Sequence, residues 1–268
     1  ISYGMKKNLG QHFLHSVSAL KKIVNEARLS PKDVVLEIGP GKGALTQMLL
    51  EKTEKIIAVE KDPKLALFLK EKFSKEIAAS QLVLLEEDIR NVGPSPSKFI
   101  PSAYKLVANI PYYLTGYTLK AFIGGKMKPS SAVLLLQKEV VERIVARDNK
   151  ESVLSISLKA YGSVKKIGIV KRGLFNPKPT VDSAILSVTN ISEKFFDGIS
   201  EEKFFEVVKK GFGQKRKKLI NNLKAYNTKK VAEAFQICSL TENVRAEDVP
   251  LLKWKCLASK LPKKSVTI

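Results

Sequence analysis

The sequence predicts an α/β fold with a doubly wound, mostly parallel sheet and a small all-helical domain at the C-terminal end. Short apolar segments alternate with amphipathic helical segments over the first 190 residues, which is typical of a parallel sheet covered by helices on both faces. Polar or glycine residues stand where several of the apolar segments end. The strand pattern stops after Ile191, which predicts the helical part.

The expected elements follow from the period of the apolar residues. Near-continuous apolar runs predict buried strands at residues 34–38, 55–59, 82–85, 104–108 and 131–136. Residues 164–170 and 184–189 are expected to form a closing pair of strands. Apolar residues at every third or fourth position predict helices at residues 17–27, 44–52, 62–73 and 138–146. Pro31 ends the first helical pattern, and prolines punctuate the connection between the last two strands.

The C-terminal part has helical periodicity and many lysines. Helices are expected within residues 201–211, 215–225, 229–235 and 249–261. We place the boundary at residues 190–193 and expect two domains, an α/β domain of residues 1–191 and a helical domain of residues 192–268.

Charge is the first indication of a partner. The chain has 47 basic and 26 acidic residues, a formal net charge of +21. Such a surface attracts polyanions, and nucleic acid is the commonest polyanion that a soluble protein meets. The alternative is a solvated lysine-rich surface that only keeps the protein soluble. The longest apolar run, residues 132–136, is far shorter than the roughly 20 residues of a membrane span, so no membrane partner is expected.

The first residues contain no apolar stretch typical of a signal peptide, which predicts a cytoplasmic protein. Cys238 and Cys256 lack a metal-like spacing, and we expect two lone thiols in a reducing compartment. His12 and His15 are the only histidines, so no metal site is expected.

A glycine-rich turn follows the first predicted strand of the sheet. Such a turn brings the backbone close to a ligand and directs free N–H groups at it. Gly39 and Gly41, followed by Ala44, satisfy the dinucleotide fingerprint, and Glu60 stands where a ribose-binding acid is expected. A tight turn for helix packing is the alternative interpretation. A nicotinamide oxidoreductase and an S-adenosyl-L-methionine (SAM) enzyme both need this arrangement, so the turn does not separate them.

Four residues mark the ends of successive predicted strands: Gly39, Glu60, Asp88 and Asn109. The carboxyl ends of parallel strands line one crevice in an open sheet, and ligands bind there. The sequence therefore predicts that these four residues share one site. Each also has a simpler interpretation, because Asp88 could cap a helix and Glu60 could pair with a nearby lysine.

The segment Asn109-Ile110-Pro111-Tyr112 favours methyl transfer to an exocyclic amine. The amine of adenine is a poor nucleophile because the ring delocalises its lone pair, and two acceptors on its hydrogens favour tetrahedral geometry. Asn109 offers a side-chain oxygen, and Pro111 restricts Ile110 to an extended conformation that directs its carbonyl into the site. Tyr112 offers a flat face for a flipped-out base. The alternative is an ordinary turn after a strand.

With these motifs the chain resembles the small-subunit ribosomal RNA adenine N6-dimethyltransferases of the KsgA type over nearly its whole length. The matching segments are residues 8–14, 37–41, 109–112, 136–140, 175–183, 211–223 and 245–247. The resemblance implies a Rossmann-like SAM-dependent methyltransferase with SAM contacts at His12, Leu14, Gly39, Gly41, Glu60, Asp88 and Asn109. It also implies that Glu60 holds the ribose, that Asp88 holds the cofactor's adenine amine, and that Phe175 faces Tyr112 across the target adenine.

The resemblance further implies a partner and a substrate. The expected product is N6-dimethyladenosine at an adjacent pair of adenosines in small-subunit rRNA, made by a monomer that acts on RNA or on a part-assembled subunit. Phosphate contacts are expected at Lys215, Arg216, Lys217 and Lys218. The alternatives are a large-subunit rRNA methyltransferase of the macrolide-resistance type and a non-catalytic RNA-binding assembly factor. The chain departs from the family pattern at His12, where many relatives have Asn, and at Thr115-Gly116 after the catalytic motif.

Overall fold

The computed structural model describes residues 12–92 and 100–262. The chain divides into two compact units, which are described separately below. The first comprises residues 1–141 and 163–191, and the second comprises residues 142–162 and 192–268. No helix among the described residues is both long and apolar enough to cross a membrane.

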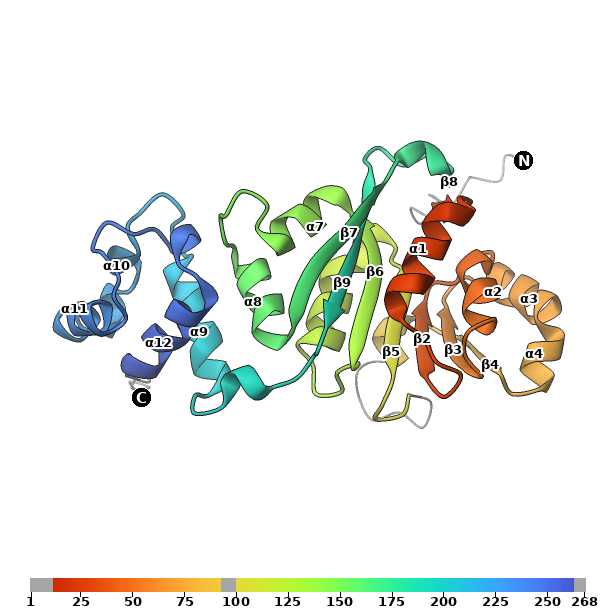
Figure 1. Ribbon diagram of the computed structural model, residues 1–268, viewed down its shortest axis with the longest axis horizontal. Coiled ribbons are helices and arrows are strands. Elements are labelled where there is room, and N and C mark those ends of the chain that lie inside the picture. Colours follow the sequence, from red (N-terminus) through yellow and green to blue (C-terminus); the bar gives the residue numbers. More distant parts are fainter. Residues whose placement is uncertain (1–11, 93–99, 263–268) are drawn as a thin grey trace, which may run out of the picture. The chain divides into compact units, whose positions relative to one another are not determined.

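The first unit is built on a seven-stranded sheet of order β4-β3-β2-β5-β6-β9-β7 (Figure 1). Its strands are β2 (Val34–Ile38), β3 (Lys55–Glu60), β4 (Leu82–Glu86), β5 (Lys105–Asn109), β6 (Ser131–Gln137), β7 (Ser163–Val170) and β9 (Ser183–Thr189). The pairs from β4 to β6 are parallel, and β9 is antiparallel to both β6 and β7. The doubly wound, mostly parallel sheet is therefore confirmed.

The order of the strands places a crevice above β2 and β5. The chain runs outward from β2 through β3 to β4, and then returns to β5 on the other side of β2. Loops that leave β2 and β5 consequently diverge, and this divergence opens the crevice in which open α/β sheets bind ligands.

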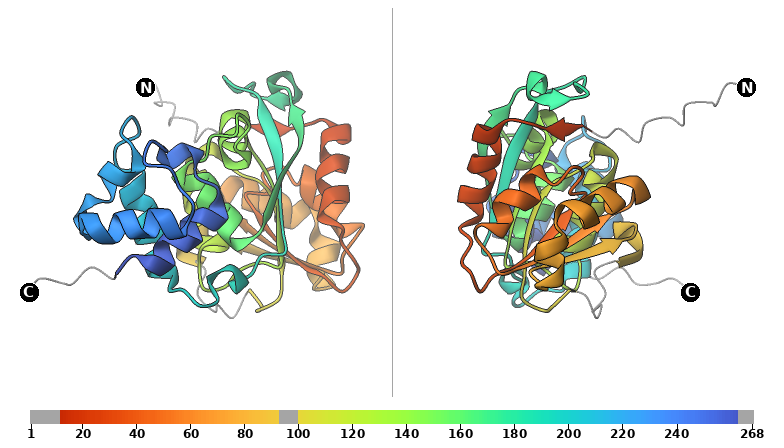
Figure 2. Two further views of the ribbon diagram at one scale, coloured as in Figure 1. Left: turned by 60° about the vertical axis from the view of Figure 1, so that its left-hand side comes forward. Right: turned by 90° about the vertical axis from the view of Figure 1, so that its right-hand side faces the viewer.

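Helices cover the sheet, as the amphipathic patterns predict. Ser16 caps α1 (Val17–Ala27), which packs on β5, β6, β7 and β9 and lies beside α2 (Ala44–Leu50) (Figures 1 and 2). Asp62 caps α3 (Pro63–Lys72), with Pro63 in the first turn where its missing N–H costs nothing. The remaining helices of this part are α4 (Ser74–Ala78), α5 (Ile89–Val92), η1 (Tyr112–Leu114), α6 (Thr115–Thr118), η2 (Leu119–Ile123), α7 (Lys138–Val145) and η3 (Arg172–Leu174).

A second, two-stranded sheet was not expected. It pairs β1 (Phe13–Leu14) antiparallel with β8 (Phe175–Asn176), with Leu14 opposite Phe175. Two-residue strands carry no periodicity that a sequence pattern could reveal. The pairing joins the described start of the chain to the connection between β7 and β9, and both segments border the crevice.

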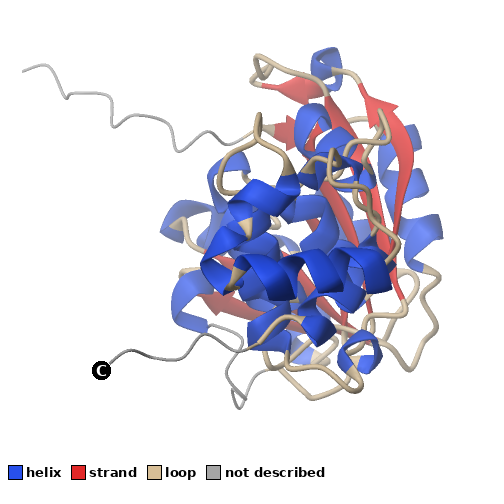
Figure 3. Ribbon diagram, turned by 90° about the vertical axis from the view of Figure 1, so that its left-hand side faces the viewer, coloured by secondary structure: helices blue, strands red, loops and turns tan. Residues whose placement is uncertain are grey.

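The second unit consists of helices joined by loops (Figure 3). Its elements are α8 (Val153–Tyr161), η4 (Lys194–Phe196), α9 (Glu201–Gly211), α10 (Leu219–Asn222), η5 (Lys224–Tyr226), α11 (Thr228–Ile237), η6 (Ala246–Asp248) and α12 (Leu251–Lys260). Residues 142–162 group with this unit although they precede the sequence-based boundary. The reason is that the Tyr161 ring packs at a tilt against the rings of Phe196 and Phe205, with centroids 5.2 and 5.9 Å away, and its hydroxyl donates a hydrogen bond of 2.6 Å to the Glu201 carboxylate.

The basic run Lys215–Lys218 lies in a loop, and the prediction of a helix there is wrong. α9 ends at Gly211, and the next helical residue is Leu219. The Asn222 side chain donates to the carbonyls of Gly211 and Gln214, at 2.6 and 3.1 Å, and so closes the loop. The end of the run is also held in extended form, because Lys218 forms a β-bridge with Arg245 and donates through Nζ to the Asn243 side chain at 2.5 Å.

The two cysteines are joined in a disulfide, so the prediction of lone thiols is wrong. Cys238 caps the C-terminus of α11, and Cys256 lies in α12. The two helices pack together, and Lys253 donates to the Cys238 carbonyl at 2.6 Å. A separation of 18 residues gives no sign of pairing in the sequence, because only the packing of α11 on α12 brings the two residues together.

We expect a thiol-specific reagent to label neither cysteine in the denatured, unreduced protein and both after reduction. Replacing Cys238 with serine should lower the free energy of unfolding by about 2–4 kcal/mol, because the cross-link no longer restricts the unfolded chain. Mass spectrometry after alkylation measures the first effect and denaturant unfolding the second. Labelling of both cysteines before reduction would contradict the assignment.

Candidate active site

A cavity of about 1160 Å³ opens at the carboxyl ends of β2, β3 and β5. Every residue predicted to serve catalysis or cofactor binding lines it: His12, Leu14, Gly39, Gly41, Glu60, Asp88, Asn109, Ile110, Pro111, Tyr112 and Phe175. A single small ligand usually occupies about 300–1,000 Å³, so the cavity has room for more than one.

The glycine loop is shaped by its backbone. Gly39 and Gly41 adopt left-handed conformations, with φ of 66° and 60°, which residues with a side chain rarely tolerate. A Cβ on Gly41 would lie 2.9 Å from the ring of Phe13, and the Lys42 ammonium sits 5.1 Å from the centre of the same ring. The loop therefore requires glycine at position 41, and Phe13 packs where a side chain would otherwise stand.

Glu60 ends β3 with its carboxylate held by the backbone. One oxygen accepts the Gly41 N–H at 3.1 Å, and the other accepts the Asp62 N–H at 2.9 Å. The side chain is buried, and this burial raises the pKa of Glu60 above its usual value. The partners of the Glu60 carboxylate are thus backbone N–H groups, and the alternative interpretation of an ion pair between Glu60 and a lysine is not supported by these contacts. Each oxygen keeps capacity for a second donor such as a hydroxyl.

Glu37 is a residue of the site to which the sequence analysis gave no role. Its carboxyl is buried in β2, lines the cavity and accepts a hydrogen bond of 2.7 Å from the Thr46 hydroxyl. Burial raises the pKa of Glu37 to about 8, so the group is mostly uncharged at neutral pH. The signal in the sequence was a single acid within an otherwise apolar strand.

Asp88 stands after β4 between two cations. Lys61 lies 2.8 Å from one of its oxygens, and the Arg90 guanidinium contacts both oxygens at 3.0 and 2.7 Å. Hydrogen bonds from Arg90 and Lys61 hold the pKa of Asp88 well below its usual range, so it is ionised. Asp88 also accepts the Arg90 N–H at 2.9 Å and thus caps α5, as the simpler interpretation expects. A helix cap and a cavity wall are compatible roles here.

The segment from Asn109 to Tyr112 presents acceptors to the cavity. The Asn109 amide nitrogen donates to the His12 carbonyl at 3.4 Å, which leaves the amide oxygen for the cavity. The Ile110 N–H donates to the Leu135 carbonyl at 3.2 Å. Within the described part of the chain the Ile110 carbonyl accepts no hydrogen bond. Pro111 packs against Gly39, whose Cβ would lie 3.4 Å from the proline ring.

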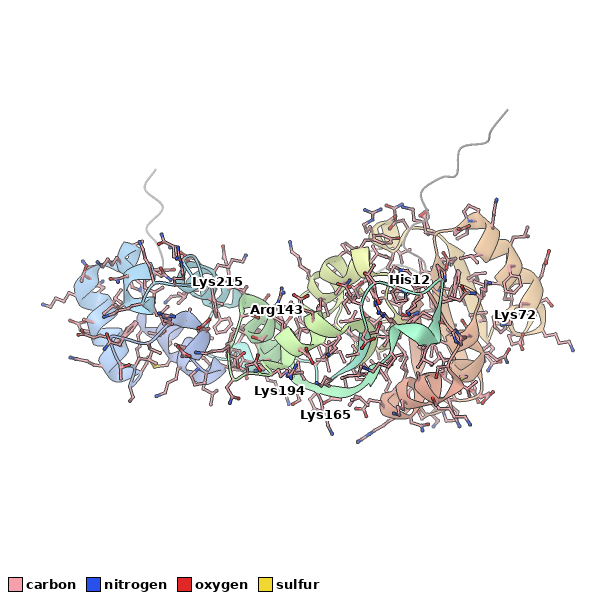
Figure 4. The ribbon with its side chains drawn as sticks, turned by 90° about the horizontal axis from the view of Figure 1, so that it is seen from above. His12, Lys72, Arg143, Lys165, Lys194 and Lys215 are labelled. Carbon is pink, nitrogen blue, oxygen red and sulfur yellow. A yellow bond between two sulfur atoms is a disulfide. The ribbon has the colours of Figure 1, made fainter. Side chains whose placement is uncertain are left out.

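Aromatic rings form the far side of the cavity. Phe175 is buried in β8, and Tyr112 is partly buried at the start of η1. The His12 ring lies 5.8 Å from the Tyr112 ring and donates through Nδ1 to the Pro177 carbonyl at 2.8 Å, so it lies against the hairpin that carries β8 (Figure 4). The Tyr112 and Ser183 hydroxyls share a hydrogen bond of 2.9 Å. The sequence analysis gave no role to Ser183, Phe13, Lys61 or Arg90.

The predicted RNA-contacting residues are elsewhere. Lys215, Arg216, Lys217 and Lys218 are exposed on the loop between α9 and α10, where Figure 4 labels Lys215. Residues 8–11 of the N-terminal motif lie outside the described residues. Among residues 12–92 and 100–262, no group of three or more His, Cys, Asp or Glu side chains could hold a metal ion.

The sheet, its glycine loop and the cavity at the carboxyl ends of the strands define a Rossmann-like fold, and the Asn109 to Tyr112 segment in that cavity favours the class of SAM-dependent methyltransferases. Residues 3–262 match the family described as Ribosomal RNA adenine dimethylase. The chain belongs to this family, and its activity is the SAM-dependent dimethylation of adenines in ribosomal RNA. The family resemblance is confirmed, and the interpretation as a nicotinamide oxidoreductase is wrong.

Curated relatives match almost the whole chain. Ribosomal RNA small subunit methyltransferase A of Dehalococcoides mccartyi (strain CBDB1) is 38% identical, over 94% of this chain and 87% of the relative. The protein of the same name from Mycoplasma mobile is 36% identical, over 96% of this chain and 98% of the relative.

Two solved structures have the same fold across both units. The 23S rRNA methyltransferase ErmE has a TM-score of 0.78 at 25% identity, over 93% of this chain and 99% of its own. A dimethyladenosine transferase from Plasmodium falciparum has a TM-score of 0.74 at 25% identity, over 92% of this chain and 96% of its own.

Proposed function

We propose that the protein dimethylates two adjacent adenosines of small-subunit ribosomal RNA at N6 and so contributes to maturation of that subunit. The observation that carries the chemistry is the Asn109 side chain, which lines the cavity with its amide nitrogen bonded to the His12 carbonyl and with an oxygen that accepts no hydrogen bond from the described residues. The choice of subunit is supported by curated relatives named for the small subunit at 36–38% identity.

The residues of the cavity fit SAM. The left-handed glycines bring the backbone of the loop to the cavity wall, and Glu60 keeps acceptor capacity for ribose hydroxyls. Asp88 is ionised and would accept from the adenine amine in exchange for one of its bonds to Arg90 or Lys61. His12 and Leu14, from the segment that pairs with β8, would complete the cofactor site with Gly39, Gly41 and Asn109. When bound, SAM supplies an electrophilic methyl group on a positively charged sulfur.

The chain's own residues would prepare the target amine. The Asn109 oxygen and the Ile110 carbonyl would accept its two hydrogens, which localises the nitrogen lone pair and favours tetrahedral geometry. Tyr112 and Phe175 would flank the base and exclude water. A general base is not needed, because the proton becomes acidic only after the methyl group has been added.

The second unit would supply phosphate contacts through Lys215, Arg216, Lys217 and Lys218. The loop is fixed at its base by Asn222 and leaves Lys215, Arg216 and Lys217 in solvent, where they can meet a phosphate backbone without large desolvation. Lys218 donates to the Asn243 side chain at 2.5 Å and would have to exchange that bond for a phosphate. We therefore assign RNA binding to residues 192–268 and catalysis to residues 1–191. The protein would act as a monomer in the cytoplasm, on RNA or on a part-assembled subunit.

Changing Lys215, Arg216 and Lys217 together to glutamine should weaken RNA binding and flatten its dependence on salt. Each lost phosphate contact is expected to reduce the slope of log K against log salt by about 0.7–0.9. The matched control replaces Lys52, Lys55 and Lys75, three exposed lysines of which Lys55 begins β3 at the end of the sheet away from the cavity. Equal slopes for the two triple variants would show that the loop makes no phosphate contact.

The proposal is tested by transfer of tritiated methyl groups from SAM to undermethylated ribosomal subunits, with the modified bases mapped. Label on two adjacent adenosines of the small-subunit RNA is the expected result. Label on the large-subunit RNA would instead establish the macrolide-resistance activity. Tight subunit binding without any label would support a non-catalytic assembly factor.

A further inference from the structure

Two contacts hold Tyr112, one to Ser183, which is not among the residues that line the cavity, and one to His12, which lines it. The Tyr112 hydroxyl lies 2.9 Å from the Ser183 hydroxyl, and the Tyr112 ring lies 5.8 Å from that of His12. η1, which Tyr112 begins, is only three residues long and follows Pro111. So short an element does little to fix a side chain by itself, and the two contacts therefore decide where the ring stands.

Ser183 is a firm anchor for the tyrosine hydroxyl. It is 1% exposed and begins β9, where it pairs with Gln137 of β6 on one side and with Val170 of β7 on the other. A buried hydroxyl needs a hydrogen-bond partner, and the Tyr112 hydroxyl is the partner here. The serine is thus set in the backbone of the sheet, whereas the tyrosine is partly exposed and depends on it.

Asp182, the residue before Ser183, is also held by hydrogen bonds. The Asp182 carbonyl accepts the Lys138 N–H at 3.0 Å, and its carboxylate accepts the Arg172 N–H at 3.0 Å and the Lys171 ammonium at 3.2 Å. These bonds close the base of the connection from β7 to β9. Phe175 lies within that connection and lines the same cavity as Tyr112. The hydrogen bond between Tyr112 and Ser183 therefore links one aromatic residue of the cavity to the end of the connection that carries the other, Phe175.

We propose that Ser183 is a positioning residue that sets the Tyr112 ring for stacking on the target adenine, through the hydrogen bond between their hydroxyl groups. This inference rests on the proposed function, because the base that would stack is the methylated adenosine. Stacking depends on the separation and tilt of the rings, and a ring free to turn about its side-chain torsions spends less time in the productive orientation. Ser183 itself touches neither cofactor nor base in this scheme.

The test is a double-mutant cycle of Ser183→Ala and Tyr112→Phe, with Ser187→Ala as control. Ser187 is equally buried in the same strand, so its variant measures the cost of losing a hydroxyl from β9. Each variant of the pair removes the same bond from one side and keeps the ring. We expect each to lower kcat/KM for undermethylated small subunits about tenfold, with the double variant no worse than either. The SAM dissociation constant should stay unchanged, and Ser187→Ala should match the wild type.

A second readout does not depend on turnover. RNA carrying 2-aminopurine at the mapped target position should lose fluorescence when the base stacks on the wild-type protein, and less so on the Ser183→Ala and Tyr112→Phe variants. Additive losses in kcat/KM, equal losses in Ser187→Ala, or an unaffected Tyr112→Phe variant would each overturn the inference. A wild-type protein that methylates no ribosomal RNA would instead overturn the proposed function, which separates the two failures.

Discussion

Replacing Asn109 with alanine is expected to lower the rate of methyl transfer by about 10²–10³-fold, the cost typical of removing one preorganised polar group from a reacting centre. The variant loses the oxygen proposed to accept an amine hydrogen, and the amine then stays flat and unreactive. The bond to the His12 carbonyl is also lost, so SAM binding should weaken but remain measurable. Single-turnover kinetics and calorimetric titration with SAM measure the two effects.

The pattern of the losses identifies the role of Asn109. If Asn109 only supported the bond to His12, the alanine variant would bind SAM more weakly but would transfer methyl groups at the wild-type rate once SAM is saturating. If Asn109 is catalytic, the rate of the alanine variant stays low at saturating SAM. An unchanged rate in the alanine variant would remove Asn109 from the mechanism and leave the segment as a turn after β5.

Replacing Gly41 with alanine should raise the SAM dissociation constant at least tenfold. The left-handed conformation alone costs a residue with a Cβ about 1–2 kcal/mol, and the new methyl group would lie 2.9 Å from the Phe13 ring. The loop must shift to relieve the backbone strain and the clash with Phe13. The Gly41 N–H, which donates to the Glu60 carboxylate at 3.1 Å, then moves away from it. Calorimetry with SAM measures the affinity.

Gly173→Ala is the matched control. A Cβ at Gly173 meets no atom within 4 Å, and its φ is not in the left-handed region. This variant should bind SAM as the wild type does. If Gly41→Ala also kept its affinity, the glycine loop would not form part of the cofactor site.

Most strands of the large sheet could be predicted from the chain because they are runs of apolar residues that are buried within the sheet. The edge strand β7 contains Lys165 and Lys166 and is mostly only partly buried. The predicted and observed bounds differ by one residue at most, for example 104–108 against Lys105–Asn109. Four residues of the cavity wall, Gly39, Glu60, Asp88 and Asn109, could also be predicted, since parallel strands bring their carboxyl ends to one edge. By contrast, His12, Leu14 and Phe175 were expected only from the family resemblance. Methyl transfer to an amine could be proposed for the segment Asn109 to Tyr112 because its residue types offer two hydrogen-bond acceptors and a flat ring to an exocyclic amine.

Other features depend on contacts between distant segments. Phe13 fills the space above Gly41 only because β1 pairs with β8, and Ser183 meets Tyr112 across 71 residues of chain. The disulfide forms because α11 packs on α12, and the basic run is a loop because Asn222 closes it. None of these pairs is marked by a local pattern.

Local sequence thus determined the elements, their order and the candidate residues, since burial and periodicity act over a few positions. Tertiary structure alone decided which side chains meet and what protonation state they take. Glu37 shows the difference, because the chain contains only an acid in an apolar strand. Its enclosure by the folded sheet raises its pKa to about 8 and makes it a neutral wall of the cavity.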